Sequence, residues 1–284
     1  MAAPYPQVVL LGDSLFQFSV ETDNGFSFEA ALQSSKNEYF ENSLKKDAML
    51  TESPGYSRRL DVVNRGLSGY NTANVLEYFE RLFPEKTPSS PEIKYLVILI
   101  GANDAVLPLP STWQHVPLEK YGENLCRIIT HPRIRAHNPK ILLVTPPPLD
   151  EIKTAKDDAA AGHPCSIRRA AISALYTQKA RDVAAEYEDV TLIDLYQVLM
   201  DKAIEMAPGD YEEGGPLPGT PENGKRAGLK ELLPDGLHLG GIAYMEFYKI
   251  LWPHIGREWL DLPEGDRAGY VFPDWRTFEP EKAE

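Results

Sequence analysis

The stretch Val8-Val9-Leu10-Leu11-Gly12-Asp13-Ser14-Leu15 decides how this sequence is interpreted. An apolar run that ends in a glycine predicts a buried strand that breaks into a turn. A serine on that turn has its hydroxyl at the mouth of a sheet, and a following helix adds backbone N–H groups and the positive end of its dipole. A serine nucleophile would be useful there. A Gly-Asp-Ser turn that only caps a helix explains the same residues.

Four further apolar runs resemble the first, because they are rich in Val, Ile or Leu without strict alternation. They occupy residues 60–63, 95–100, 141–145 and 190–193. Helical stretches alternate with them, at residues 72–83, 118–130, 167–188 and 243–260. This order predicts an α/β fold with a parallel sheet whose two faces are both covered. Ligands of such sheets bind beyond the carboxyl ends of the strands, where Ser14 and the segments 66–72, 101–104 and 145–149 should meet.

Composition limits the classes of protein that this chain can represent. Its 284 residues suit one large domain, and its net charge of −13 argues against nucleic acid or an anionic membrane as a partner. Nothing in the sequence predicts a membrane-spanning segment or a secretory signal, and Cys126 and Cys165 are too few for a disulfide framework. We therefore expect a cytoplasmic protein, with homo-oligomerisation left open.

Two segments look like insertions into this single domain of residues 1–284. Residues 21–58 mix charges, serines and aromatic residues, and residues 204–234 are rich in Gly and Pro. Long segments of this kind tend to be binding loops, lids or disordered. A C-terminal extension from about residue 262 carries scattered aromatic residues and is expected to wrap the surface.

A base and an orienting carboxylate occur together in Asp235-Gly236-Leu237-His238. Positions three apart on a helical turn share a face, so Asp235 can bind Nδ1 of His238 and leave Nε2 to accept the Ser14 proton. The alternative is an aspartate that caps the helix beginning near Gly240, beside a surface histidine.

Donors for an oxyanion are predicted at two other strand ends. Asn103, within Gly101-Ala102-Asn103-Asp104, can aim its side-chain amide at the developing charge, and Gly69 can present a backbone N–H without a side chain in the way. An Asx turn at Asn103 and an ordinary turn glycine at Gly69 are the alternatives.

The four pieces together resemble the blocks of the SGNH, or GDSL-type, hydrolases. The second block, Asn64-Arg65-Gly66 with Ser68-Gly69-Tyr70-Asn71-Thr72, and the segments at 145–148 and 235–239 are most similar to the isoamyl acetate-hydrolysing esterase branch. The resemblance covers residues 8 to about 259. It implies a three-layer α/β/α sandwich, flavodoxin-like, with a parallel sheet of about five strands.

The resemblance also implies roles for individual residues. Ser14, Asp235 and His238 would be the catalytic residues, and the N–H of Ser14, Gly69 and Asn103 would form the oxyanion hole. Phe16 and Tyr70 are predicted to line the substrate pocket, with packing in the core as the alternative for Phe16. At the position of Phe16 the branch usually has a small hydroxyl residue. No cofactor and no metal ion are expected.

Other motifs receive weaker interpretations. Ser68 nearly imitates a nucleophile elbow, but Tyr70 replaces its final glycine. The basic pairs Arg58-Arg59 and Arg168-Arg169 are predicted to be solvated surface in this acidic chain.

The sequence thus predicts a serine esterase that hydrolyses small or short-chain carboxylic esters, of acetate type, through an acyl-enzyme. Two alternatives stay open: an acyltransferase or deacetylase acting on a larger sugar or natural product, and a non-catalytic binding module on the same fold. Phe16 and the longer 21–58 and 204–234 segments depart from the pattern of the branch and lie close to the predicted mouth of the site, so they bear on the substrate and not on the chemistry.

Overall fold

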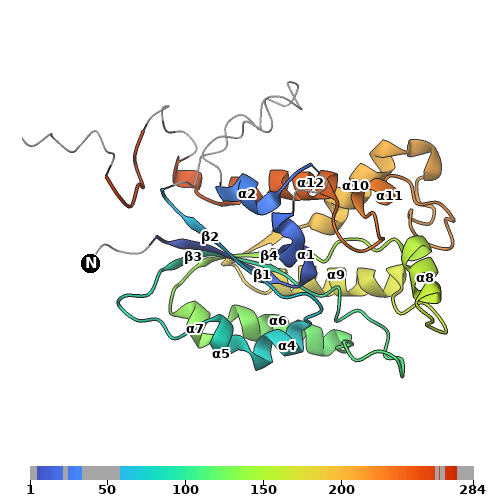
Figure 1. The fold of residues 1–284 in the computed structure, drawn as a ribbon, viewed down its shortest axis with the longest axis horizontal. Helices are drawn as coiled ribbons and strands as arrows, with labels where there is room; N and C mark the ends of the chain where they lie inside the picture. The colour runs from blue at the N-terminus through green and yellow to red at the C-terminus, as the bar shows by residue number, and fades with distance from the viewer. Residues whose placement is uncertain (1–4, 22–24, 34–57, 260–261, 263–265, 274–284) are drawn as a thin grey trace, which may run out of the picture.

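A five-stranded parallel sheet forms the centre of the molecule (Figure 1). The computed structural model describes residues 5–21, 25–33, 58–259, 262 and 266–273. The strands are β1 (Gln7–Gly12), β2 (Asp61–Gly66), β3 (Ile93–Leu99), β4 (Lys140–Val144) and β5 (Val190–Ile193). They lie in the order β2-β1-β3-β4-β5, and every neighbouring pair is parallel. The predicted α/β class and all five predicted strands are confirmed.

Helices cover both faces of this sheet, as Figure 1 shows. One layer holds α4 (Thr72–Glu77), α5 (Phe79–Leu82), α6 (Leu118–Ile129), α7 (Pro132–Arg135) and α9 (Ala170–Ala185). The other holds α2 (Phe28–Gln33), α10 (Leu195–Met206), α11 (Leu229–Leu232) and α12 (Gly241–Leu251). The short α1 (Ser14–Gln17) follows β1, and α8 (Glu151–Ala160) lies beyond the end of β4. Four 3₁₀ turns complete the described elements: Phe18–Val20, Pro208–Asp210, Trp252–His254 and Arg257–Trp259.

Strand β1 explains why both faces need cover. Its side chains alternate between the two sides, so that Val8 and Leu10 pack in one buried cluster while Val9 and Leu11 pack in the other. All four are almost fully buried. Continuous apolar sequence is therefore what this central strand requires.

The strand order indicates where a ligand can bind at the edge of the sheet. From β1 the chain continues to β2 on one side, and β3 then lies on the other side of β1. At such a switch point the loops that leave the two strands diverge and open a crevice at their carboxyl ends. Ser14 follows β1 and Asn103 follows β3, so both predicted residues flank this point.

Helix boundaries differ from the predicted ones where local geometry intervenes. The predicted helix 72–83 is interrupted at Tyr78, whose φ of −98° and ψ of 12° separate α4 from α5. The predicted helix 243–260 ends as α12 at Leu251, where Pro253 follows in a 3₁₀ turn. The described part of the chain contains no helix with the length and apolar character to cross a membrane.

The two insertion-like segments have different outcomes. Most of residues 21–58 lies outside the described residues, apart from α2 and its approach. The 204–234 segment is described, and its end is not a surface loop: Leu229, Leu232 and Leu233 are fully buried in the core beside α12.

The prediction that Arg58-Arg59 is solvated surface is wrong for Arg59, which is only 8% exposed. Its Nε donates to the carbonyl of Ala268 at 2.8 Å, and its guanidinium lies 4.8 Å from the ring centre of Tyr270. Arg58 stacks on the same ring, at 4.8 Å. The two arginines thus fasten residues 266–273 beside the start of β2.

Candidate active site

Ser14 is the first residue of α1, at the point where β1 ends. Gly12, the last residue of β1, packs so closely on the neighbouring strand that a side chain would place its Cβ 2.2 Å from the carbonyl oxygen of Leu99. Asp13 caps the helix, since its Oδ1 accepts the N–H of Leu15 at 2.9 Å. Ser14 therefore has a fixed backbone, and it is 6% exposed.

His238 connects Ser14 to Asp235. Its Nε2 lies 2.9 Å from Oγ of Ser14, and its Nδ1 lies 2.6 Å from Oδ2 of Asp235. The other carboxylate oxygen of Asp235 accepts the backbone N–H of Leu237 at 2.9 Å and of His238 at 2.8 Å. Three side chains from the two ends of the chain thus form one hydrogen-bonded row.

These contacts also determine the ionisation of Asp235. Burial alone would raise its pKa, but the hydrogen bonds from His238 and Leu237 hold the pKa well below its ordinary value. An ionised carboxylate accepts hydrogen bonds only, so Nδ1 of His238 carries a proton and Nε2 presents its lone pair to Ser14.

The turn that carries Asp235 and His238 packs against Asp150, the N-cap of α8. Gly236 has a φ of +90°, its carbonyl accepts the N–H of Asp150 at 2.9 Å, and a Cβ there would lie 2.9 Å from the Asp150 carbonyl oxygen. The buried carboxylate of Asp150 pairs with Arg226 of the 204–234 segment. Helix α12 has Gly240 as its N-cap with no side-chain cap, so the alternative that Asp235 caps this helix is not observed.

Asn103 lies between two groups that define the orientation of its amide. Its Nδ2 donates to the carbonyl of Tyr70 at 2.9 Å, and its Oδ1 accepts from Nη2 of Arg168 at 3.1 Å. The residue is 4% exposed. Neither contact is the local hydrogen bond of an Asx turn.

Gly69 adopts a left-handed conformation with a φ of +81°, and its carbonyl accepts from Nε2 of Gln114 at 2.8 Å. It directly precedes Tyr70, the residue bound by Asn103. Among the described residues, neither the Gly69 N–H, the Ser14 N–H nor the second hydrogen of Asn103 Nδ2 has a protein acceptor. Donors without a protein partner are what an oxyanion hole must offer.

Two buried carboxylates underlie this edge. Burial raises the pKa of Asp13 to about 6, although the hydrogen bond from the Leu15 N–H and the charge of Arg168 lower it, and Oδ2 of Asp13 has no hydrogen-bond partner. Burial likewise raises the pKa of Asp104 to about 7. Asp104 accepts the N–H and the hydroxyl of Thr72, the latter at 2.5 Å, and thereby ties the start of α4 to the segment after β3.

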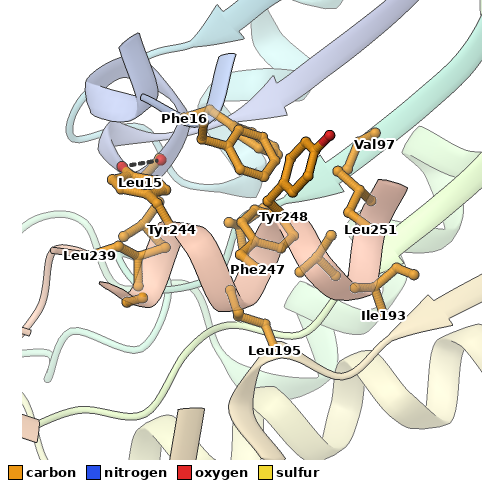
Figure 2. Close-up of a cluster of buried hydrophobic side chains, with 14 of the residues drawn as sticks. Leu15, Phe16, Val97, Ile193, Leu195, Leu239, Tyr244, Phe247, Tyr248 and Leu251 are labelled. Atoms are coloured by element: carbon orange, nitrogen blue, oxygen red, sulfur yellow. Dashed lines mark hydrogen bonds between the residues drawn. The ribbon is translucent and has the colours of Figure 1, made fainter. Parts of the chain in front are cut away.

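The prediction that Phe16 lines a substrate pocket is wrong. Its side chain is fully buried, and Figure 2 shows it pointing into the apolar cluster beside α12. The ring stacks at 6.0 Å on Phe247 and lies 6.2 Å from Phe28. Residues two apart on a helical turn face different sides, so Phe16 points away from Ser14. Tyr70 is half-buried and its ring lies 6.1 Å from that of Tyr78; its contact with substrate stays a prediction.

One cavity borders the Asp235–His238 turn, and a second contains none of the predicted catalytic residues. One of about 270 Å³ lies beside Asp235 and His238, and Phe18 borders it with its ring edge-on to His238 at 5.2 Å. A larger one, of about 470 Å³, lies between the start of α9, α10 and the 204–234 segment, and neither Ser14 nor Asn103 lines it.

Comparison with known proteins identifies the family. Residues 10–244 match the GDSL-like lipase/acylhydrolase family. The chain belongs to this family. An isoamyl acetate-hydrolyzing esterase 1 homolog of Rattus norvegicus is 27% identical over 99% of this chain and 91% of its own length, and the Homo sapiens homolog is 26% identical over the same shares. A GDSL esterase/lipase of Arabidopsis thaliana is 45% identical over 33% of this chain and 40% of its own.

Solved structures support the same fold. An acetyl xylan esterase aligns over 88% of this chain and 99% of its own with a TM-score of 0.56 and 17% identity. A lipase/acylhydrolase from Enterococcus faecalis aligns over 88% and 95% with a TM-score of 0.52 and 20% identity. The predicted membership of the GDSL-type hydrolases and the predicted fold are confirmed.

The prediction that Arg168 is solvated surface is wrong. The side chain is half-buried, and its guanidinium contacts Asn103 and the carbonyl of Ala102. It lies on a segment with no regular structure, so periodicity gave no signal. Asp104 was missed as a supporting residue, although its position directly after Asn103 could have indicated it.

Proposed function

We propose that this protein is a serine esterase that hydrolyses small or short-chain carboxylic esters through an acyl-enzyme. The row Ser14–His238–Asp235, with heavy-atom distances of 2.9 and 2.6 Å, is the observation that carries the proposal. The first distance is within hydrogen-bond reach for a nucleophile and its base, and the second is within reach for a base and the carboxylate that orients it. Membership of a hydrolase family supports the same activity.

In the first half-reaction Oγ of Ser14 attacks the ester carbonyl while Nε2 of His238 takes its proton. Asp235 stabilises the imidazolium that forms, because its carboxylate stays ionised and bound to Nδ1. The N–H groups of Ser14 and Gly69 and the amide of Asn103 stabilise the oxyanion of the tetrahedral intermediate. His238 then protonates the leaving alcohol.

In the second half-reaction water replaces the alcohol. His238 removes a proton from the water, the hydroxide attacks the acyl carbon, and the same donors stabilise the second oxyanion. Collapse of this intermediate releases the carboxylic acid and returns the proton to Ser14. No step needs a cofactor, and the absence of one stays a prediction, as does a cytoplasmic location. Among the described residues no group of three or more His, Cys, Asp or Glu side chains is placed to hold a metal ion.

Acetate-type esters of small alcohols are the substrates that we propose. The relatives named isoamyl acetate-hydrolyzing esterase 1 homolog extend over 99% of this chain, which supports this choice. An acyltransferase or deacetylase acting on a larger acceptor would use the same residues.

The test is a panel of p-nitrophenyl esters of increasing acyl length, with and without added alcohol. We expect kcat/KM to be highest for acetate or butyrate, and the product to be the free acid. Transfer of the acyl group to the added alcohol at a rate above hydrolysis would favour the acyltransferase. Ser14→Ala should reduce hydrolysis to background; wild-type activity in this variant would reject the proposal.

A further inference from the structure

Arg168 is the one arginine seen in direct contact with the predicted oxyanion donor Asn103 within the described part of the chain. Its Nη2 donates to Oδ1 of Asn103 at 3.1 Å, and its Nε lies 3.4 Å from the carbonyl oxygen of Ala102. Burial lowers the pKa of Arg168, but an arginine remains protonated at neutral pH. The guanidinium can therefore only donate hydrogen bonds.

The consequence concerns the two ends of the Asn103 amide. Tyr70 offers a carbonyl oxygen, which accepts only, and Arg168 offers donors only. A flipped amide would set oxygen against the Tyr70 oxygen and Nδ2 against the guanidinium. With Asn103 almost fully buried, both mismatches would be left unpaired. One orientation is thus fixed, with the second Nδ2 hydrogen left for an oxyanion.

Arg168 is itself held in place by its neighbours in the chain. The carbonyl of Ile167 accepts the N–H of Leu107 at 2.8 Å, and the hydroxyl of Ser166 donates to the carbonyl of Arg168 at 2.7 Å. On the other side, Asp158 accepts the N–H of Ile167 at 2.9 Å. The segment before α9 is therefore fastened to the segment after Asn103, and the guanidinium is presented from a fixed backbone.

We infer that Arg168 is a positioning residue that orients the Asn103 amide for oxyanion binding. This inference rests on the proposed esterase function. Arg168 acts through Asn103, so its contribution must vanish when the Asn103 amide is absent. Tyr70 still holds Nδ2 when Arg168 is removed, so the loss is smaller than that from removing Asn103 itself.

A double-mutant cycle on p-nitrophenyl acetate hydrolysis tests this. We expect Arg168→Met to lower kcat by about tenfold with KM changed less than about threefold, below the roughly 10²–10³-fold typical of losing one oxyanion donor. Arg168→Lys keeps a charged donor but loses the planar guanidinium, so it should recover part of the loss. In the Asn103→Ala background Arg168→Met should change kcat by less than twofold.

Arg181→Met is the matched control. Arg181 also binds through Nε and Nη2, but to the carboxylate of Asp194 and away from the site. It should lower thermal stability while kcat stays at the wild-type value. The inference is overturned if Arg168→Met has a wild-type kcat, or if it lowers kcat equally in both backgrounds. Should Arg168→Met fail to fold, the Arg168→Lys and Arg168→Gln variants in the same cycle decide.

The Ser14→Ala variant, measured alongside, separates this inference from the proposed function. If Ser14→Ala hydrolyses the ester normally, the proposed function fails. If Ser14→Ala is inactive while the cycle shows no coupling between Arg168 and Asn103, only the positioning role fails.

Discussion

Replacing Asp235 by asparagine should change the tautomer of His238 while leaving the turn intact. In the native protein the N–H groups of Leu237 and His238 donate to Oδ1 of Asp235 at 2.9 and 2.8 Å. The carbonyl oxygen of the asparagine can still accept both. The amide nitrogen would then face Nδ1 of His238, 2.6 Å away in the native protein. Two donors cannot face each other at that distance, so the imidazole must shift its proton to Nε2.

An imidazole with its proton on Nε2 cannot accept the proton of Ser14. In Ser-His-Asp enzymes this exchange costs roughly 10⁴-fold in kcat, which corresponds to about 5.5 kcal/mol of transition-state stabilisation. The fold should be preserved, because both backbone hydrogen bonds of the turn are retained. We therefore expect the variant to have a near-native free energy of unfolding and almost no activity.

The assay is steady-state hydrolysis of p-nitrophenyl acetate, with urea denaturation of the same preparations. Asp157→Asn is the matched control, because the Asp157 side chain is 51% exposed, as is that of Asp235, and pairs with a lysine away from the site. Its kcat should equal that of the wild type. A kcat for Asp235→Asn within tenfold of wild type would refute the assigned role of Asp235.

Three further predictions concern the surroundings of Ser14. Asn103→Ala should lower kcat by roughly 10²–10³-fold in the same assay while circular dichroism stays native; a loss of less than about threefold would exclude Asn103 from the oxyanion hole. Gly12→Ala should lower the free energy of unfolding in urea by about 1–3 kcal/mol, because the new Cβ would lie 2.2 Å from the Leu99 carbonyl oxygen; unchanged stability would contradict this packing. Burial raises the pKa of Asp104 from 3.8 to about 7, so between these pH values the folded state keeps a proton that the unfolded state has lost. The contribution of Asp104 therefore lowers the free energy of unfolding as the pH rises from 3.8 to about 7. Asp104→Asn lacks this effect, so its free energy of unfolding relative to wild type should be higher at pH 8 than at pH 5, and a pH-independent difference would show that Asp104 does not titrate in this way.

The sheet could be predicted from the sequence because the chemistry of each strand is local. Strand β1 is an apolar run buried on both faces, and its glycine marks where it must end. The predicted strand ends then place Ser14 and Asn103 on one edge of the sheet, whereas His238 lies in the turn between α11 and α12. The observed distances between Ser14, His238 and Asp235 depend on the packing of Gly236 against Asp150, which no local pattern contains.

The predictions for Phe16 and Arg168 are wrong because the fold, and not the local sequence, determines where these two side chains lie. The proximity of Phe16 to Ser14 in sequence favours a place in the pocket, but the helical turn of α1 directs its side chain into the core. The charge of Arg168 favours the surface, because charged residues are mostly exposed. Its contact with Asn103 joins positions 65 residues apart through an irregular segment, so only the folded chain reveals it.

The nucleophilic role of Ser14 is the central claim, and mass spectrometry of the protein treated with a fluorophosphonate tests it most directly. The probe phosphonylates an activated serine and stays attached, so peptide mapping identifies the residue. We predict a single adduct, on the peptide that carries Ser14, together with loss of esterase activity, and no adduct in Ser14→Ala. An adduct on another serine, or full activity after complete labelling of Ser14, would contradict the account.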